Sequence, residues 1–166
     1  MSLTSPHTWD AVVVPEGSAE VVELSQGGAF RLLVDASATS RAFSANRLTL
    51  SLGVDGAKPH YHALSSELFY VLAGTTEFLL GERIVTAGRG SLVAVPPKVV
   101  HAFGAAPDST ADLLVIMAPG VERFEYFRRL GRISHGQDSF DSLLPEQDRF
   151  DVHFADSTAW PRARAR

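Results

Sequence analysis

Short apolar runs, separated by glycine, proline and small polar residues, follow one another up to residue 119 and constrain the fold more than any other feature. In 47–55, Leu48, Leu50 and Leu52 alternate with polar residues, the period of two expected of a strand with one buried face. Gly74 and Thr75 separate two further runs, and we expect a hairpin turn there. The strand-like segments are 11–15, 19–24, 30–35, 47–55, 67–74, 75–81, 81–90, 91–96, 101–106 and 111–119. Short strands at this spacing predict an all-β fold, either an antiparallel barrel or a sandwich.

The pattern changes after Pro119, where apolar residues recur at helical spacing. The segment 121–133 places Phe124 and Phe127 on one face, and two arginines precede Gly131, where we expect the helix to end. A second short helix is expected at 145–150. No linker rich in Pro, Gly or Ser divides the chain. We therefore expect one domain over 1–166, with N-terminal strands in 1–45, a barrel core in 46–118 and a helical extension in 119–166.

The composition excludes several classes of protein. The 166 residues include no cysteine, which excludes disulfides, zinc–thiolate sites and thiol nucleophiles. The net charge is −4 and the sequence has no basic stripe, so we expect no nucleic-acid partner. No apolar stretch approaches the ~18 residues of a membrane span, and the first residues lack the pattern of a secretory signal. A cytoplasmic protein without a membrane partner is the expectation.

Two histidines one residue apart are the most informative local feature. On a strand, His60 and His62 point to the same face, while Tyr61 faces the other way. Glu67 opens the next apolar run after a short turn, so it can fold back beside the imidazoles, and burying it as an unpaired charge would be costly. Two imidazoles and a carboxylate are a ligand set typical of non-haem iron and related metals. The alternative is a surface or hydrogen-bonded histidine pair.

His101 is the fourth candidate ligand. It begins another strand-like run after a turn that contains proline, and it is the only further histidine within the strand-rich segment. The remaining histidines fall in terminal or loop-like parts of the chain, where we expect solvated side chains. They are His7, His135 and His153.

These residues resemble the two sequence motifs of the cupin family. The first motif, G-x5-H-x-H-x3–4-E-x6-G, is matched with the leading glycine one residue further away than usual. Its residues here are Gly53, His60, His62, Glu67 and Gly74. The second motif, G-x5-P-x-G-x2-H-x3-N, is matched at Gly90, Pro96 and His101. Lys98 replaces its inner glycine and Ala105 its asparagine.

The resemblance covers roughly 46–118 and implies a jelly-roll barrel, the double-stranded β-helix of cupins. It also implies that His60, His62, Glu67 and His101 hold one divalent transition metal. Nitrogen and carboxylate donors suit iron, manganese, nickel, cobalt, copper or zinc, so the sequence does not identify the ion. Lys98 predicts either a strained left-handed backbone or a turn rearranged by the two preceding prolines. Loss of the asparagine at Ala105 leaves the four ligand positions intact.

Strand alternation predicts the lining of a pocket around this site. Phe69 and Val71 share the face of Glu67, and Phe103 shares the direction of His101. An apolar, aromatic cavity favours a hydrophobic or aromatic small molecule as substrate. The alternative is that these residues are barrel core, which is the better account of Val71.

Three classes of function remain open. The chain is similar in layout to the quercetinase-type dioxygenases, and the resemblance implies a metal-dependent dioxygenase in which Glu67 is the catalytic proton acceptor. A metal-dependent isomerase, cyclase or lyase is the second class, and a non-enzymatic small-molecule-binding barrel is the third. A homodimer is also expected, because small barrels leave strand edges that need covering.

Overall fold

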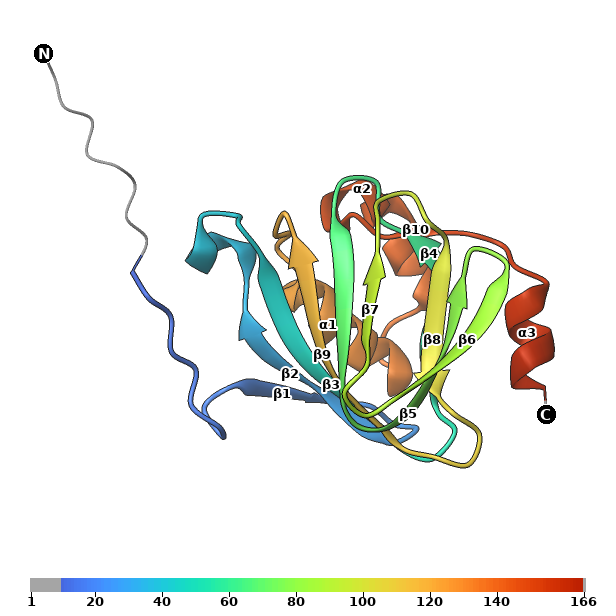
Figure 1. Ribbon diagram of the computed structural model, residues 1–166. Helices are drawn as coiled ribbons and strands as arrows, with labels where there is room; N and C mark the ends of the chain where they lie inside the picture. Colours follow the sequence, from blue (N-terminus) through green and yellow to red (C-terminus); the bar gives the residue numbers. More distant parts are fainter. Residues whose placement is uncertain (1–9, 166) are drawn as a thin grey trace, which may run out of the picture.

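The computed structural model describes residues 10–165, and within this range the chain forms a strongly curved antiparallel sheet with short helices after it (Figure 1). The prediction of an all-β fold with a helical C-terminal extension is confirmed. The elements are β1 (Glu20–Glu23), β2 (Gly28–Val34), η1 (Ala36–Thr39), β3 (Ser44–Leu50), β4 (Asp55–Tyr61), β5 (Ser66–Leu80), β6 (Arg83–Gly88), β7 (Leu92–Val95), β8 (His101–Ala105), β9 (Ala111–Ala118), α1 (Phe124–Ser134), η2 (Phe140–Glu146), α2 (Gln147–Phe150), β10 (His153–Phe154) and α3 (Ala159–Arg164).

Strand β5 joins the two halves of the barrel. The sheet runs in the order β1-β2-β3-β9-β5-β8-β4-β10, and β6 and β7 also pair with β5. The first half of β5 pairs with β9 and β7, whereas its second half pairs with β8 and β6. The strand therefore holds both sheets together along its 15 residues.

The predicted hairpin at Gly74–Thr75 is wrong, because β5 continues through both residues. Gly74 has a φ of 71° and lies next to a shift of register against β9, so it bends the strand without ending it. A Cβ at this position would lie 1.9 Å from the Thr110 carbonyl oxygen. Glycine is thus required by the close approach of β9 and by the left-handed backbone.

The N-terminal prediction of a strand at 11–15 is also wrong, whereas β1 and β2 match the strands predicted at 19–24 and 30–35. Val13 is 82% exposed and the segment pairs with no described strand, so its β-branched residues form a strand-like sequence without a ladder. His7 lies outside the described residues.

Helix α1 packs against the inner side of the curved sheet. Its start is capped by Asp35, whose carboxylate accepts hydrogen bonds from the backbone N–H groups of Arg123 (2.7 Å) and Phe124 (3.2 Å). The Phe127 ring lies 4.6 Å from the Phe30 ring of β2. The helix runs three residues beyond its predicted end, because Gly131 lies buried in its last turns.

Gly131 allows α1 to lie close to β1. A Cβ on Gly131 would come within 2.4 Å of a methyl group of Val22, so glycine here serves packing between the helix and the strand. The short helical turns η2 and α2 follow, near the helix predicted at 145–150. None of the helices within residues 10–165 is long and apolar enough to cross a membrane.

Candidate metal centre

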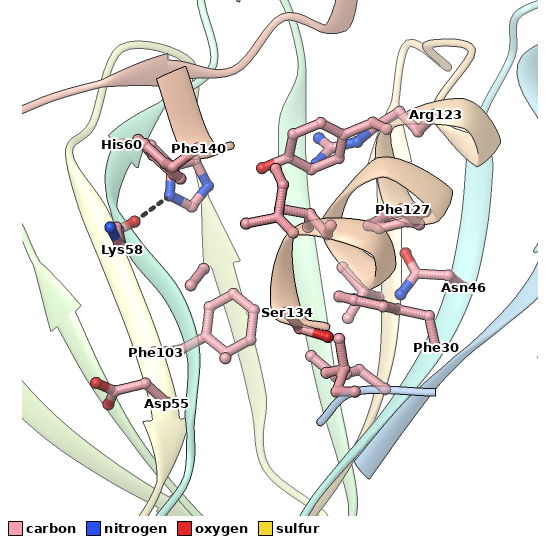
Figure 2. A pocket seen from close by; sticks show the side chains of 18 of the residues that line it. Phe30, Asn46, Asp55, Lys58, His60, Phe103, Arg123, Phe127, Ser134 and Phe140 are labelled. Carbon is pink, nitrogen blue, oxygen red and sulfur yellow. Dashed lines mark hydrogen bonds between the residues drawn. The ribbon is translucent and has the colours of Figure 1, made fainter. Parts of the chain in front are cut away.

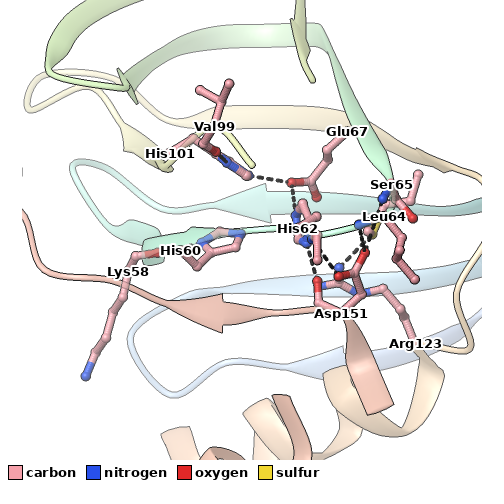
Figure 3. A network of polar contacts seen from close by, with 12 residues as sticks. Lys58, His60, His62, Leu64, Ser65, Glu67, Val99, His101, Arg123 and Asp151 are labelled. Carbon is pink, nitrogen blue, oxygen red and sulfur yellow. Dashed lines mark hydrogen bonds and ion pairs between the residues drawn. The ribbon is translucent and has the colours of Figure 1, made fainter. Parts of the chain in front are cut away.

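Four buried side chains, from three neighbouring strands and the turn that follows one of them, converge inside the barrel (Figure 3). His60 lies near the end of β4, directly opposite His101 at the start of β8. His62 follows β4, and Glu67 lies in the first half of β5. One donor atom from each of the four residues lies within 4.8 Å of the other three. The structure thus brings together all four residues that the sequence singled out, in a cluster of the kind that binds a metal in cupins.

The backbone fixes the protonation of the three imidazoles. The Nδ1 atom of His60 lies 2.6 Å from the Lys58 carbonyl oxygen, that of His62 2.5 Å from the Asp151 carbonyl, and that of His101 2.9 Å from the Val99 carbonyl. A carbonyl oxygen can only accept, so each Nδ1 carries a proton and donates it. In a neutral imidazole this leaves the Nε2 lone pair free to bind a cation.

The Nε2 atoms face a carboxylate, and this arrangement fits a bound cation. Nε2 of His62 and Nε2 of His101 each lie 2.8 Å from the same oxygen of Glu67, Oε2. With Nδ1 protonated, two neutral imidazoles would direct lone pairs at a negatively charged oxygen. Either extra protons or a cation must stand between them, and a divalent ion satisfies all of these donors at once. The donor set therefore fits a transition metal.

The electrostatics of the cluster favour the forms that bind a metal. Burial lowers the pKa of His60 well below its usual value, and the neighbouring His101 and His62 lower it further. Burial alone would raise the pKa of Glu67, but the charges and hydrogen bonds of His62 and His101 outweigh it and hold that pKa well below its usual value. His60 is thus neutral and Glu67 ionised near neutral pH.

The C-terminal extension supplies a supporting residue that the sequence analysis missed. Asp151 is 3% exposed, and its carbonyl accepts the His62 proton. Its carboxylate accepts hydrogen bonds from the backbone N–H groups of Ala63, Leu64 and Ser65, which connect His62 to Glu67 (Figure 3). Asp151 therefore holds both the ring of His62 and the turn that carries Glu67 back to the cluster.

The neighbourhood of Asp151 also corrects an expectation about His153. Instead of being solvated, the His153 side chain is 19% exposed and stacks on Tyr61 at 5.0 Å between ring centroids. Strand β10 pairs with β4 at this point, opposite Tyr61 and His60. The extension is thus joined to the strand that carries the first two histidines. His135 is exposed, as expected.

A cavity of about 310 Å³ opens beside the cluster, between the sheet and α1 (Figure 2). His60 and Glu67 are among the residues that line it, so a molecule in the cavity reaches the cluster. Most of the lining is apolar. The apolar residues include Phe30, Leu48, Phe103, Phe127, Leu130 and Ile133.

Of the three residues predicted to line the pocket, only Phe103 does so. Phe69 and Val71 are fully buried and belong to the hydrophobic core instead. The Phe69 ring contacts the rings of Phe78 (5.2 Å) and Phe103 (4.9 Å) in this core. Alternation gave the correct face for these residues but not their depth within the barrel.

Helix α1 contributes two polar groups to the cavity, which strand alternation could not have placed. Tyr126 lines it, as does Arg123, which Figure 2 labels. Burial raises the pKa of Tyr126 to about 12, with a smaller lowering effect from Arg123 and a raising effect from Glu67. The phenol is therefore neutral at physiological pH and can donate a hydrogen bond.

The departure from the second motif at Lys98 is resolved by its backbone. Lys98 has a φ of 69°, the left-handed conformation that the motif's glycine normally provides. This conformation directs its N–H to the His62 carbonyl at 2.7 Å. The turn before His101 is thus tied to the strand end that carries His62, at the cost of some strain in a residue with a Cβ.

Three histidines and a glutamate thus lie together inside a small antiparallel barrel, beside an apolar cavity, in an arrangement that fits a bound metal. Residues 46–117 match the sequence model of the family described as "Cupin domain". The matched part of the chain contains all four clustered residues. A comparison with curated proteins gives no match.

Solved structures share this fold at low sequence identity. An RmlC-like cupin from Shewanella frigidimarina is 19% identical over 70% of this chain and 96% of its own, with a TM-score of 0.57. KdgF from Halomonas sp. is 16% identical over 63% of this chain and 92% of its own, with a TM-score of 0.54. A variant of Streptomyces PAC13 with uridine is 19% identical over 69% of this chain and 86% of its own, also with a TM-score of 0.54. Pac13 is described as a nucleoside dehydratase. These likenesses concern the fold.

Proposed function

We propose that this chain is a metal-dependent cupin enzyme that oxidises a small aromatic or enolic substrate with dioxygen. The observation that carries the proposal is a set of three imidazoles beside an apolar cavity, each with its Nδ1 atom bound to a backbone carbonyl, and two of them, His62 and His101, with Nε2 directed at Glu67. One divalent transition metal held by His60, His62, Glu67 and His101 would be the cofactor, and it would supply a Lewis acid and a redox centre at that point.

Glu67 is the proposed proton acceptor. Its Oε2 atom is occupied by His62 and His101, whereas Oε1 has no hydrogen bond within the described residues. A substrate hydroxyl in the cavity can therefore give its proton to Oε1 without displacing either imidazole. The apolar lining excludes water from this transfer and receives the ring of the substrate.

Metal-assisted proton transfer without dioxygen, as in an isomerase or a lyase, is the second candidate. The specific observation in its favour is Tyr126, a neutral phenol that lines the same cavity as Glu67. Within residues 10–165 its hydroxyl has no hydrogen-bond partner, so it is available to a substrate. A carboxylate base and a phenolic acid in one cavity are the two groups that such a reaction needs.

The first experiment tests the metal. The wild type, His62→Ala and His101→Ala are purified in parallel with His135→Ala, an exposed histidine outside the cluster, as the control. Elemental analysis should give close to one metal per chain for the wild type and the control, and little for the two cluster variants. Full metal content in both cluster variants would reject the assignment.

The second experiment separates the classes of function. The protein is loaded in turn with iron, manganese, nickel, cobalt, copper or zinc, and oxygen uptake is followed with a panel of flavonols and enediols. The dioxygenase proposal predicts uptake with at least one metal, and loss of nearly all of it in Glu67→Gln with metal still bound. Turnover under nitrogen would favour the isomerase or lyase. Ligand binding with no turnover in either atmosphere would leave a binding protein.

We also propose a homodimer. Strand β1 is an edge of the sheet, and Val12 and Val21 are each 44% exposed beside Val13 at 82%. A second copy would cover this edge and these apolar side chains. Light scattering at micromolar concentration should give about twice the chain mass of 17.9 kDa. A mass equal to that of one chain would exclude the dimer.

A further inference from the structure

Arg123 is a buried cation with no acidic partner among residues 10–165. It is 5% exposed and lines the cavity from the start of α1. Its Nη1 atom contacts the sulfur of Met117 at 2.6 Å, its guanidinium lies over the rings of Tyr126 (4.7 Å) and Phe127 (5.2 Å), and its Nε is buried without a hydrogen-bond partner. These contacts support the side chain but bring no negative charge to it.

Other arginines of the described chain show what is missing. Arg47 pairs with Asp112, Arg128 with Glu20, and Arg164 with Asp55. Those guanidiniums are all more exposed than that of Arg123. A guanidinium stays protonated inside proteins, and burying one without a counter-ion is costly. A chain that keeps its most deeply buried arginine unpaired at a cavity wall leaves that charge for a ligand.

We propose that the cavity binds a small molecule with an apolar body and one carboxylate, and that the carboxylate pairs with Arg123. This inference names the substrate class of the site and rests on the proposed function. A single planar guanidinium matches a planar carboxylate with two parallel hydrogen bonds. A phosphate dianion would need more positive charge, and the other cation of the lining, Lys58, has its ammonium over the Phe140 ring at 4.0 Å.

The position of Arg123 sets the direction of the bound molecule. Arg123, Tyr126 and Glu67 line the same cavity, and the Arg123 guanidinium lies over the Tyr126 ring at 4.7 Å. With its carboxylate on Arg123, a ligand directs its other end toward Glu67 and His60. Its apolar body then lies against Phe103 and the aliphatic residues of α1.

The test compares phenylacetate with its neutral analogue phenylacetamide by titration calorimetry. Both probes are first titrated into chelator-treated protein, in which a carboxylate has no metal to bind. The titrations are then repeated after the protein has been loaded with Zn²⁺. The wild type should prefer the carboxylate by about tenfold or more without metal. Arg123→Met should lose this preference, whereas Arg129→Met should keep it. Arg129 is a matched control, because it lies on α1, whose N-cap is Arg123, is largely buried and does not line the cavity.

Two outcomes would overturn the inference. The first is an equal affinity for both probes in the metal-free wild type. The second is a preference that appears only with Zn²⁺ and persists in Arg123→Met, which would place the carboxylate on the metal. If Arg123→Met does not fold, Arg123→Gln is judged by the same two criteria. Metal content and oxygen uptake are measured separately, so a protein with no turnover but an arginine-dependent preference would reject the proposed function alone.

Discussion

Replacing Asp151 with asparagine tests whether the C-terminal extension supports the metal centre. The substitution keeps the size of the side chain and suits the backbone, since Asp151 has a φ of 50°, a conformation that asparagine tolerates well. The carbonyl that holds His62 also remains. What is lost is the negative charge that three backbone N–H groups share.

The size of the effect follows from those three hydrogen bonds. Ala63 donates to Oδ1 at 2.7 Å, and Leu64 and Ser65 donate to Oδ2 at 3.1 and 3.2 Å. An amide can accept two of them at most, because its NH₂ group then faces the third donor. Hydrogen bonds to charged groups contribute ~1.5–3 kcal/mol and neutral ones ~0.5–1.5 kcal/mol. Losing one bond and weakening two should destabilise the protein by about 3 kcal/mol.

The assay combines urea unfolding with metal titration. We expect Asp151→Asn to lower the unfolding midpoint and to weaken metal affinity by about 10- to 100-fold, as other residues that orient metal ligands do. Asp148→Asn is the control, because the Asp148 side chain is fully exposed in the same C-terminal segment. Amide exchange of Ala63 and Ser65 should also accelerate in Asp151→Asn alone. Unchanged metal affinity together with unchanged exchange would refute the supporting role.

Three further predictions concern stability. Folding lowers the pKa values of His60 and Glu67, so the unfolded chain binds more protons at these two residues than the folded chain does. The metal-free protein should therefore lose stability as the pH falls through about 6.5 and again near 4.5. Urea midpoints between pH 7.5 and 4 measure this, and a flat profile would contradict it. Lys98→Gly should relieve the strain of the left-handed backbone but increase the entropy of the unfolded chain, for a net stabilisation of about 0.5 kcal/mol in the same assay. A loss of stability above 1 kcal/mol would count against this prediction. Gly74→Ala should destabilise by about 3 kcal/mol or prevent folding, since its Cβ would collide with the Thr110 carbonyl; wild-type melting would disprove the bend at Gly74.

The four residues of the cluster could be predicted because local sequence carries their geometry. A period of two puts His60 and His62 on one face, and a short turn returns Glu67 to them. Asp151 could not be predicted in this way, since it reaches His62 across 89 residues of sequence. Arg123 and Tyr126 were missed for a similar reason: their direction depends on how α1 docks on the sheet.

The error at Gly74 has a physical cause as well. A glycine with positive φ suits both a hairpin turn and a bulge within a strand. What decides between them is the partner strand, and here β9 and β8 continue the ladder on either side of the bend. Phe69 lies in the core and not at the cavity wall, because sequence alternation gives the face of a residue but not its depth; Val71 lies in the core too, which is the account that the sequence favours for that residue.

The bond between His62 and Asp151 has a consequence for the order of events during synthesis. The ring of His62 acquires its fixed proton only when a carbonyl 89 residues later is in place. At the ~5–20 residues per second of translation, roughly 4–18 s separate the two residues. A nascent chain can hold all three histidines and the glutamate and still lack the acceptor that orients one of them. We therefore expect tight metal uptake to follow synthesis of residue 151, and a chain that stops before residue 151 to bind the ion weakly.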